Sequence, residues 1–477
     1  MGQKIDDSHF SDHDFRVFSQ RLRQETELLV RWVEDGRFPA LPLMGGLELE
    51  CWLVDRQGAP APVNRQFLEW ANDPLIVPEL ARFNIELNSE PQVLAGRALS
   101  RMAADLDARW RHCRRVAARL DADVVMIGIL PTAGEEQFTV GNMSDQARYR
   151  ALNEQVFRSR QGAPLRLHVE GRDRLDTVHH DVMLEAAATS FQVHLRTPAE
   201  RAAAFYNAAL LMSPLMVAAC ANAPYLFGRD LWTETRIPVF EQAVASPPRD
   251  GCGDLKGRVT FGDRFARNDV TECFRQNLEC FDPLLPMEVD KYPASLSHLR
   301  LHNGTIWRWN RPLIGFEEDG SPHFRIEHRT VSAGPTVEDC IANTALFFGL
   351  SLALVDECAD LADRLDFGGL RKDFYSAART GLESTIVWLD GRRHGLVTLL
   401  SDVLLPRCDT ALKQAGLDSE DVSRYLGIIG RRVSSGVTGA CWQRAQCERL
   451  QGDMRGLLMA YMDRQRSGRP VHEWDLE

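Results

Sequence analysis

The segment Gly45-Gly46-Leu47-Glu48-Leu49-Glu50 alternates apolar and acidic residues directly after two glycines, which is typical of a strand with one buried face. Residues i and i+2 of a strand point to the same side. The leucines would therefore pack into a core, while Glu48 and Glu50 place two carboxylates side by side. Adjacent like charges repel unless a cation bridges them or a proton is shared. Taken alone, the pair is also compatible with a solvated strand face.

The same spacing of charged residues occurs twice more in the chain. The segment Asn84-Ile85-Glu86-Leu87-Asn88-Ser89-Glu90 again places carboxylates at even intervals. In Phe324-Arg325-Ile326-Glu327-His328-Arg329, two arginines and Glu327 share one side of a strand. Carboxylate oxygens are the ligands that Mg²⁺ prefers in proteins. Three strands of this kind favour a site for hard divalent cations over three separate solvated faces.

A fourth strand-like segment, Ser190-Phe191-Gln192-Val193-His194, places Gln192 and His194 on one side. Glutamine is neutral and histidine is neutral when unprotonated, so both can complete a metal or nucleotide shell without adding charge. A lone histidine is more often structural. Beside the acidic strands we favour the functional interpretation.

The segment Gly304-Thr305-Ile306-Trp307-Arg308-Trp309-Asn310-Arg311-Pro312 is rich in tryptophan and arginine. As a strand it would place Trp307, Trp309 and Arg311 on one side and Arg308 on the other. Arginines near a metal suit polyphosphate or acyl phosphate, although salt bridges to the same carboxylates are an equal alternative. The chain contains no Walker or Rossmann phosphate loop, so ATP would have to be bound through metals and arginines.

Hydrophobic periodicity predicts an α+β core over residues 1–335 and a helical C-terminal region over residues 336–477, packed on the core. Several strands follow one another without a helix between them, so the sheet should be mainly antiparallel. We expect helices over residues 14–35, 100–120 (capped by Ser100), 199–221 and 341–355. We expect strands over residues 47–55, 84–90, 124–130, 165–170, 191–195, 305–309 and 324–329, and a loop-rich region over 223–292.

Composition limits the kind of protein. The chain has 477 residues, 44% of them hydrophobic, and a formal net charge of -11, which argues against nucleic acid as the main partner. Its 11 cysteines form no Cys-x-x-Cys pair, which predicts neither a disulfide framework nor a zinc site and fits a reducing, cytoplasmic compartment. Residues 1–10 are polar, so no signal peptide is expected. The apolar run over 202–223 is interrupted by Asn207 and Pro214 and predicts a buried helix, not a membrane span.

The ordered set of motifs resembles the bacterial and plant-type glutamate–cysteine ligases and related carboxylate–amine ligases. The resemblance extends from about Gly45 to Asp339 and is carried by five segments: Gly-Gly-Leu-Glu-Leu-Glu, Ile-Glu-Leu-Asn-Ser-Glu-Pro, Thr-Ser-Phe-Gln-Val-His, Ala-Asn-Ala-Pro-Tyr-Leu-Phe-Gly and Arg-Ile-Glu-His-Arg. The Trp-Arg-Trp-Asn-Arg-Pro segment departs from the usual pattern of the family. The region after residue 340 matches no pattern that we can specify, so the substrates are left open.

The resemblance implies a glutamine-synthetase-like fold, in which a curved antiparallel sheet flanked by helices binds ATP and Mg²⁺ or Mn²⁺. It implies metal ligands at Glu48, Glu50, Glu90, His194 and Glu327, with Glu86 as a secondary candidate and Gln192 as an alternative to His194. It implies catalytic roles for Arg329, Glu327 and Arg236, the last following the Asn222-Ala223-Pro224 segment. It implies nucleotide or substrate contacts by Gln192, Arg308 and Arg311.

The expected reaction joins an amino-acid carboxylate, by family default the glutamate side chain, to an amine such as cysteine through an acyl phosphate. The expected partners are therefore small amino-acid and amine substrates, with no nucleic acid and no membrane, and a homo-oligomer is left open. Two alternatives remain at this point. One is a phosphotransferase on the same fold, and the other is a non-catalytic nucleotide- or metabolite-binding protein.

Overall fold

The computed structural model describes residues 10–287, 289 and 292–475, and its centre is a curved antiparallel sheet of eight strands. The strand order is β11-β12-β8-β1-β3-β2, and β4 and β5 also pair with β1. The strands are β1 Met44–Asp55, β2 Ile76–Pro78, β3 Asn84–Asn88, β4 Gln92–Val93, β5 Ala122–Val125, β8 Phe191–Thr197, β11 Asn310–Phe316 and β12 Pro322–His328. The predicted α+β fold with a curved antiparallel sheet is confirmed.

Strand β1 alternates as its sequence predicts. Leu47 and Leu49 are buried at 2% and 0% exposure, whereas the glutamates between and after them face the other side of the sheet. Gly45 is required on the apolar side, because a Cβ atom there would lie 2.4 Å from Cζ of Phe348. Helix α9 (Val337–Leu354), which carries that phenylalanine, can therefore approach the strand closely.

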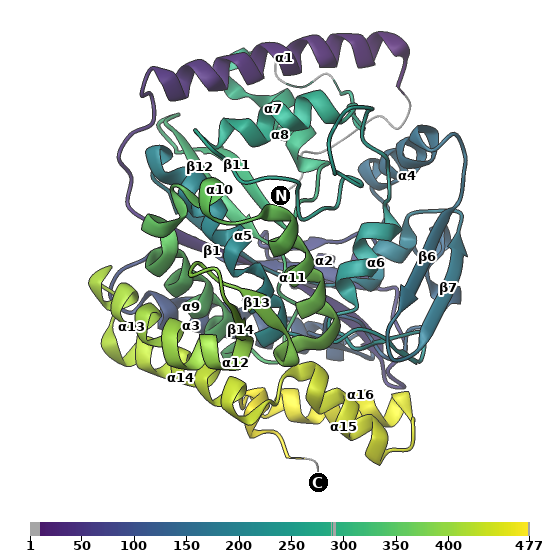
Figure 1. The fold of residues 1–477 in the computed structure, drawn as a ribbon. Coiled ribbons are helices and arrows are strands. Elements are labelled where there is room, and N and C mark those ends of the chain that lie inside the picture. Colours follow the sequence, from purple (N-terminus) through teal and green to yellow (C-terminus); the bar gives the residue numbers. More distant parts are fainter. Residues whose placement is uncertain (1–9, 288, 290–291, 476–477) are drawn as a thin grey trace.

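Helices cover the apolar face of the sheet, as the ribbon shows (Figure 1). This layer consists of α3 (Ala98–Ala118), α5 (Ala202–Ala219) and α9. Helix α1 (Asp12–Glu34) lies across α7 (Thr271–Cys280) and α8 (Ser297–Gly304) at the opposite end of the molecule from the C-terminal helices (Figure 1). The other face of the sheet carries the polar residues.

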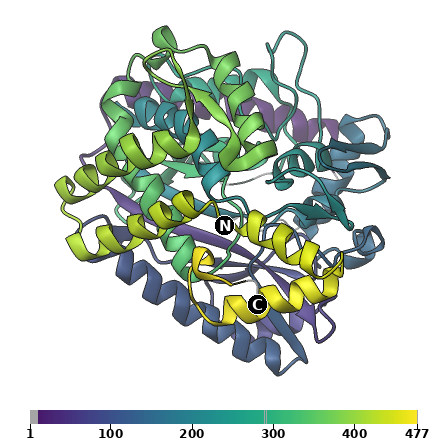
Figure 2. The ribbon, with the colours of Figure 1, turned by 60° about the horizontal axis from the view of Figure 1, so that its bottom comes forward.

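The C-terminal region is helical, as predicted, and its last helices lie side by side across one end of the molecule (Figure 2). One buried apolar cluster includes residues from both sides of position 335. The remaining helices are α2 Asn64–Ala71, α4 Ala147–Ser159, α6 Arg236–Ala243, α10 Leu361–Arg364, α11 Phe367–Thr380, α12 Leu396–Thr398, α13 Leu405–Gln414, α14 Ser419–Ser435, α15 Gly439–Arg449 and α16 Met454–Arg466. The remaining strands pair as β6 Leu165–Glu170 with β7 Arg174–His179, β9 Tyr225–Leu226 with β10 Arg229–Asp230, and β13 Thr385–Val387 with β14 Arg393–Gly395.

Two segments, Ala199–Ala219 and Val337–Cys358, are long and apolar enough to cross a membrane by length and composition alone. In the most apolar 18-residue stretch of each segment, 89% and 78%, respectively, is buried inside the molecule. Both pack against the sheet and against each other. They therefore serve as core helices in this fold.

The predicted strand over residues 305–309 is wrong. Helix α8 ends at Gly304, and the strand begins only at Asn310, which pairs with His328 of β12. Pro312 lies inside the strand because β11 is at the edge of the sheet, where a missing backbone N–H is tolerated. Trp309 and Arg308 precede the strand, so their side chains do not follow the predicted alternation.

Other boundaries also differ from the predictions. The strand predicted over 124–130 ends at Val125, because Met126 O instead accepts hydrogen bonds from the side chains of Tyr461 and Gln465. The helix predicted from residue 100 begins at Ala98, and Ser100 does not cap it. The Ser100 backbone N–H donates to Asp421 Oδ2 at 2.9 Å, which ties this helix to α14. The region over 223–292 contains α6 and α7 in addition to loops.

Candidate active site

Strand register brings the acidic segments together on the polar face of the sheet. Glu48 of β1 lies opposite Gln192 of β8, and His194 of β8 lies opposite Glu327 of β12. His194 Nε2 is 3.2 Å from Glu48 Oε1 and 3.9 Å from Glu327 Oε1. We call Glu48, His194 and Glu327 the metal-side group, because one ligand atom from each lies within 4.8 Å of the other two.

The chemistry of the metal-side group fits Mg²⁺ or Mn²⁺. Two carboxylates and an imidazole offer hard oxygen and borderline nitrogen ligands. His194 Nε2 is buried, and Glu48 Oε1 lies 3.2 Å from it, so in its neutral form this nitrogen can bind an ion together with that carboxylate. These three are among the predicted metal ligands, and the structure places them close enough to share one cation.

Both carboxylates of the metal-side group are held in the charged form. Burial opposes ionisation of Glu48, but the adjacent His194 outweighs it and lowers the pKa of Glu48 to about 2. Burial also opposes ionisation of Glu327, yet Arg311 and Arg329 lower its pKa below the usual range. The two carboxylates are therefore ionised near neutral pH.

Glu50 lies next to the metal-side group and is linked to Arg329 through one glutamine. Glu50 Oε2 accepts a hydrogen bond from the Ser190 backbone N–H at 2.6 Å, and its Oε1 accepts one from Gln192 Nε2 at 3.0 Å. Gln192 Oε1 in turn accepts from Arg329 Nη1 at 2.7 Å. Arg329 follows β12 directly, and its Nη1 also donates to Glu327 Oε2 at 3.2 Å.

Arg329 keeps donor capacity for a ligand. Its Nε is buried and has no hydrogen-bond partner among the described residues. Burial would lower the pKa of Arg329, but Glu327, Glu50 and Glu48 raise it above its ordinary value. A charged guanidinium with an unused donor beside a candidate metal site is suited to a phosphoryl oxygen.

Two other arginines that the sequence predicted for the site form hydrogen bonds with the residues that make it up. Arg311 donates to both oxygens of Glu327, at 2.9 and 3.0 Å, and thereby fixes that carboxylate. Arg236 is 1% exposed, and its Nη2 donates to the carbonyl oxygens of Arg329 and Thr330 at 3.2 and 2.7 Å. Both arginines hold the residues that face the polar side of the sheet.

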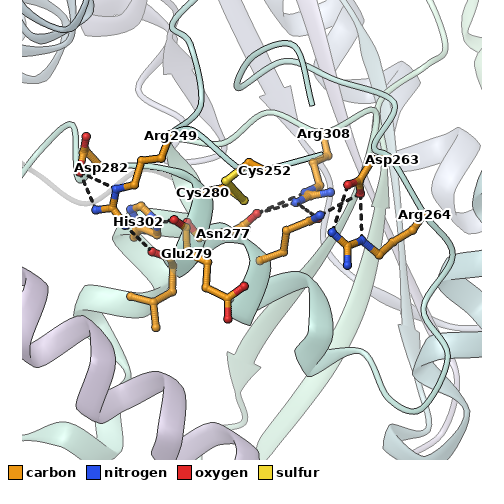
Figure 3. Close-up of a disulfide and its surroundings, with 12 residues drawn as sticks. Arg249, Cys252, Asp263, Arg264, Asn277, Glu279, Cys280, Asp282, His302 and Arg308 are labelled. Carbon is orange, nitrogen blue, oxygen red and sulfur yellow. Dashed lines mark hydrogen bonds and ion pairs between the residues drawn. A yellow bond between two sulfur atoms is a disulfide. The ribbon is translucent and has the colours of Figure 1, made fainter. Parts of the chain in front are cut away.

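Two predicted site residues lie elsewhere. Glu90 follows the end of β3 and is exposed. Arg308 is buried and donates to Gln276 and Asn277 of α7 (Figure 3). In this network the structure also joins Cys252 to Cys280 in a disulfide, whereas the cysteine pattern predicted none (Figure 3). The other nine cysteines are free.

Sequence reasoning missed three charged residues around Glu50. They are Glu79 after β2, Arg148 on α4 and Glu185 in the short 3-10 helix Met183–Ala187. No local pattern marks them, because they come from three separate segments that meet only in the folded chain. Arg148 follows an unremarkable polar loop, and Glu185 is a single acidic residue between apolar ones.

The sheet has helices on one face and carboxylates, a histidine and arginines on the other, which is the arrangement that the sequence resemblance implied. The chain belongs to the glutamate–cysteine ligase family 2, whose model matches residues 44–463, and the protein is therefore a carboxylate–amine ligase. The match covers the whole sheet and most of the C-terminal helices. No curated protein sequence matches the chain.

Solved structures share the fold at low sequence identity. The glutamate–cysteine ligase of Francisella tularensis, in complex with AMP, is 11% identical, with a TM-score of 0.57, and the alignment covers 92% of this chain and 91% of that one. A bifunctional glutathione synthetase from Pasteurella multocida is 10% identical, with a TM-score of 0.48 over 93% of this chain and 55% of that one. The Francisella structure supports the predicted fold.

Proposed function

We propose that this ligase uses ATP and Mg²⁺, or Mn²⁺, to join an amino-acid carboxylate to an amine through an acyl phosphate. The observation that carries the proposal is the metal-side group with Arg329 beside it on one face of the sheet. The carboxylate substrate is the side chain of glutamate, by analogy with the family. The AMP bound by the Francisella relative gives further support for a nucleotide substrate.

Each residue of the site has a separate role in the proposed reaction. Glu48, His194 and Glu327 would hold the divalent ion, which would neutralise charge on the nucleotide phosphates. Arg329 donates to the γ-phosphoryl group as it moves, because charge on its oxygens must be balanced in the transition state. Arg311 keeps Glu327 in place, and Arg236 fixes the backbone at Arg329.

The bond changes balance without a further co-reactant. A carboxylate oxygen of the amino acid attacks the γ-phosphorus of ATP, and ADP leaves, which gives the acyl phosphate. The amine nitrogen then attacks the carbonyl carbon, loses a proton and displaces orthophosphate. The products are an amide, ADP and phosphate.

Trapping with hydroxylamine tests this function. Incubation with ATP, Mg²⁺, glutamate and hydroxylamine should yield a hydroxamate together with equal amounts of ADP and phosphate. Production of AMP and pyrophosphate would indicate that the intermediate is an acyl adenylate and not an acyl phosphate. Phosphoryl transfer without hydroxamate would indicate a phosphotransferase, and no nucleotide turnover with any carboxylate–amine pair would indicate a binding protein.

A further inference from the structure

A cavity of about 610 Å³ lies where α2 and α4 begin, and it is lined by residues outside the candidate active site. Its volume is in the range of small-molecule binding sites. Neither the metal-side group nor Arg329 lines it. We call this cavity the arginine pocket, because its lining includes Arg65 of α2, Arg82 between β2 and β3, and Arg150 of α4.

The three arginines of the pocket converge on one carboxylate. Arg150 Nη1 donates a hydrogen bond to Asp145 Oδ1 at 2.8 Å. This hydrogen bond and the charge of Arg150 lower the pKa of Asp145, and the charges of Arg65 and Arg82 add to the effect. The three guanidinium groups are therefore close enough to act on the same group, although they come from three separate segments of the chain.

The positive charge of the arginine pocket exceeds its negative charge. The lining contains two carboxylates, Asp145 and Glu154, and three arginines. Arg65 Nε also lies 3.4 Å from Glu69 Oε1, but both side chains are mostly exposed, and such surface pairs are weak. Arg82 is exposed and forms no ion pair with any described residue. Its guanidinium is therefore available to a ligand.

The beginnings of two helices add to this excess of positive charge. Helix α2 starts at Asn64 and α4 starts at Ala147, and neither has a capping side chain or an acidic residue in its first turn. Asn64 lines the pocket, and so does Asp145, which lies two residues before α4. The positive ends of both helix dipoles therefore lie beside the arginines, at a cost in free energy that an anion in the pocket would remove.

The polar side chains around the pocket are fixed in ways that leave donors for a ligand. Asn64 is 3% exposed, and its Nδ2 donates to Ser144 Oγ at 2.9 Å and to the Ala81 carbonyl oxygen at 3.2 Å. Asn153 Oδ1 accepts a hydrogen bond from the Val182 backbone N–H at 3.0 Å. The Asn153 side-chain nitrogen has no acceptor in the described part of the chain. Together with the arginines it offers donors, which suit an anion.

The charge and the number of donors favour a phosphate group over a carboxylate. A phosphate ester carries nearly two negative charges at neutral pH and has three acceptor oxygens, so it can contact guanidinium groups from three directions. A carboxylate has one charge and two oxygens. Val140, which is 57% exposed, and Met143 also line the pocket and offer apolar surface to the rest of such a molecule.

We propose that the arginine pocket binds a small molecule that carries a phosphate group and an apolar part, at a site separate from the one proposed for ATP. Arg65, Arg82 and Arg150 hold the phosphate group, and Val140 and Met143 contact the apolar part. The inference does not depend on the proposed ligase chemistry, because it rests on residues that take no part in that chemistry.

Calorimetric titration of the whole protein with phenyl phosphate tests the proposal. EDTA is present and nucleotide is left out, so that no metal ion binds phosphate at the active site. At about pH 8 phenyl phosphate is a dianion, and the wild type should bind it at least about tenfold more tightly than phenyl sulfate, which carries one charge. The double variant Arg65→Gln/Arg82→Gln should bind phenyl phosphate at least about tenfold more weakly than the wild type, because hydrogen bonds between charged groups are lost.

Two control variants locate the binding. The double variant Arg16→Gln/Arg23→Gln removes the same charge from exposed positions of α1 and should bind phenyl phosphate as the wild type does. Arg329→Lys changes the candidate active site and should also leave this affinity unchanged. Melting curves without ligand check that each variant folds. If the pocket double variant melts at a lower temperature than the wild type, Arg82→Gln alone takes its place, since this side chain has no ion pair to lose.

The outcomes separate the arginine pocket from other sources of binding. Phenyl phosphate should raise the melting temperature of the wild type and not that of the pocket variant, which would support the proposal. Absence of binding to the wild type, or equal affinity of the wild type and the pocket variant, overturns it. Loss of binding in Arg329→Lys alone would place the phosphate at the active site and overturn it as well. Tighter binding of succinate than of phenyl phosphate would show a dicarboxylate site and refute the phosphate assignment.

Discussion

Two groups of carboxylates lie on the same face of one sheet, Glu48 and Glu327 of the metal-side group and Glu86 opposite Glu50, yet they differ in charge. Burial raises the cost of ionisation in both groups. Glu48 and Glu327 overcome it because a histidine and two arginines lie beside them, and their pKa values fall. Glu86 lacks such partners, and burial followed by Glu48 and Glu50 raises its pKa to about 7. Neighbouring charge, and not depth in the molecule, separates the two groups.

The largest effect is expected from Glu327→Gln. This change removes a metal-side charge and leaves Arg311 and Arg329 without their shared partner. We expect turnover to fall on the order of 10³-fold, since loss of metal-assisted charge stabilisation is worth several kcal/mol. The check is ADP release together with Mn²⁺ affinity. Normal Mn²⁺ affinity in this variant would remove Glu327 from the metal-side group.

Arg329→Lys should have the next largest effect. The change keeps the positive charge but loses the planar guanidinium, so kcat should fall on the order of 10²-fold, the scale for loss of one preorganised donor. Steady-state kinetics and a melting curve measure the effect.

Arg308→Lys is the matched control for that variant. Arg308 is also a buried arginine, but it binds Gln276 and Asn277 of α7. We expect it to lower the melting temperature and to leave kcat within about twofold, since loss of a buried hydrogen bond acts on stability. The opposite pattern in the two variants would show that Arg329 is structural and that Arg308 contacts the nucleotide.

The two groups should also respond to pH with opposite signs in metal-free protein. Glu86 has an ordinary pKa of 4.5, and its pKa is about 7 in the folded chain, so folding retains a proton that the unfolded chain releases. The stabilisation of the folded state by protonated Glu86 is therefore present in acid and is lost as pH rises from about 4.5 to about 7. Between about pH 5 and pH 8 the loss should be on the order of 2 kcal/mol, and Glu86→Gln should abolish it. Urea unfolding at the two pH values measures the difference.

Glu48→Gln provides the opposite case. Because the pKa of Glu48 is lowered from 4.5 to about 2, its contribution to stability is present at neutral pH and is lost as pH falls through that interval. The free energy of unfolding of this variant should therefore fall less steeply than that of the wild type as pH decreases in acid. Above about pH 5 the two proteins should show the same dependence on pH. If the free energy of unfolding depended on pH in the same way in Glu48→Gln and Glu86→Gln, the separation of the two groups would be contradicted.

The smallest effect is expected from Gln192→Leu, which removes the link between Glu50 and Arg329. Loss of these hydrogen bonds should cost about 1 kcal/mol and lower kcat by about tenfold or less. Steady-state kinetics of the variant measure the fall in kcat, and its affinity for Mn²⁺ is the second measurement. A large loss of Mn²⁺ affinity would show instead that Gln192 is itself a metal ligand.

The elements with a regular period were the most predictable from sequence. The alternation in β1, the apolar helices α5 and α9, and the charged strand β12 lie close to their expected positions because one buried face defines each period. The segment before β11 was placed wrongly, since its tryptophans mimic a strand while their contacts come from other elements. Trp309 Nε1 donates to Glu241 at 2.8 Å, a partner distant in sequence.

The sequence by itself determined that Glu48, Glu50, Gln192, His194 and Glu327 lie on polar strand faces, because alternation is a local property of the backbone. Only the tertiary structure decided which of them meet. Strand register placed His194 opposite Glu327 and within reach of Glu48, and it left Glu90 exposed beyond the end of β3. Only the packing of α4 and the 3-10 helix brought Arg148 and Glu185 to the same site, since contacts between distant segments depend on the whole core and leave no local pattern.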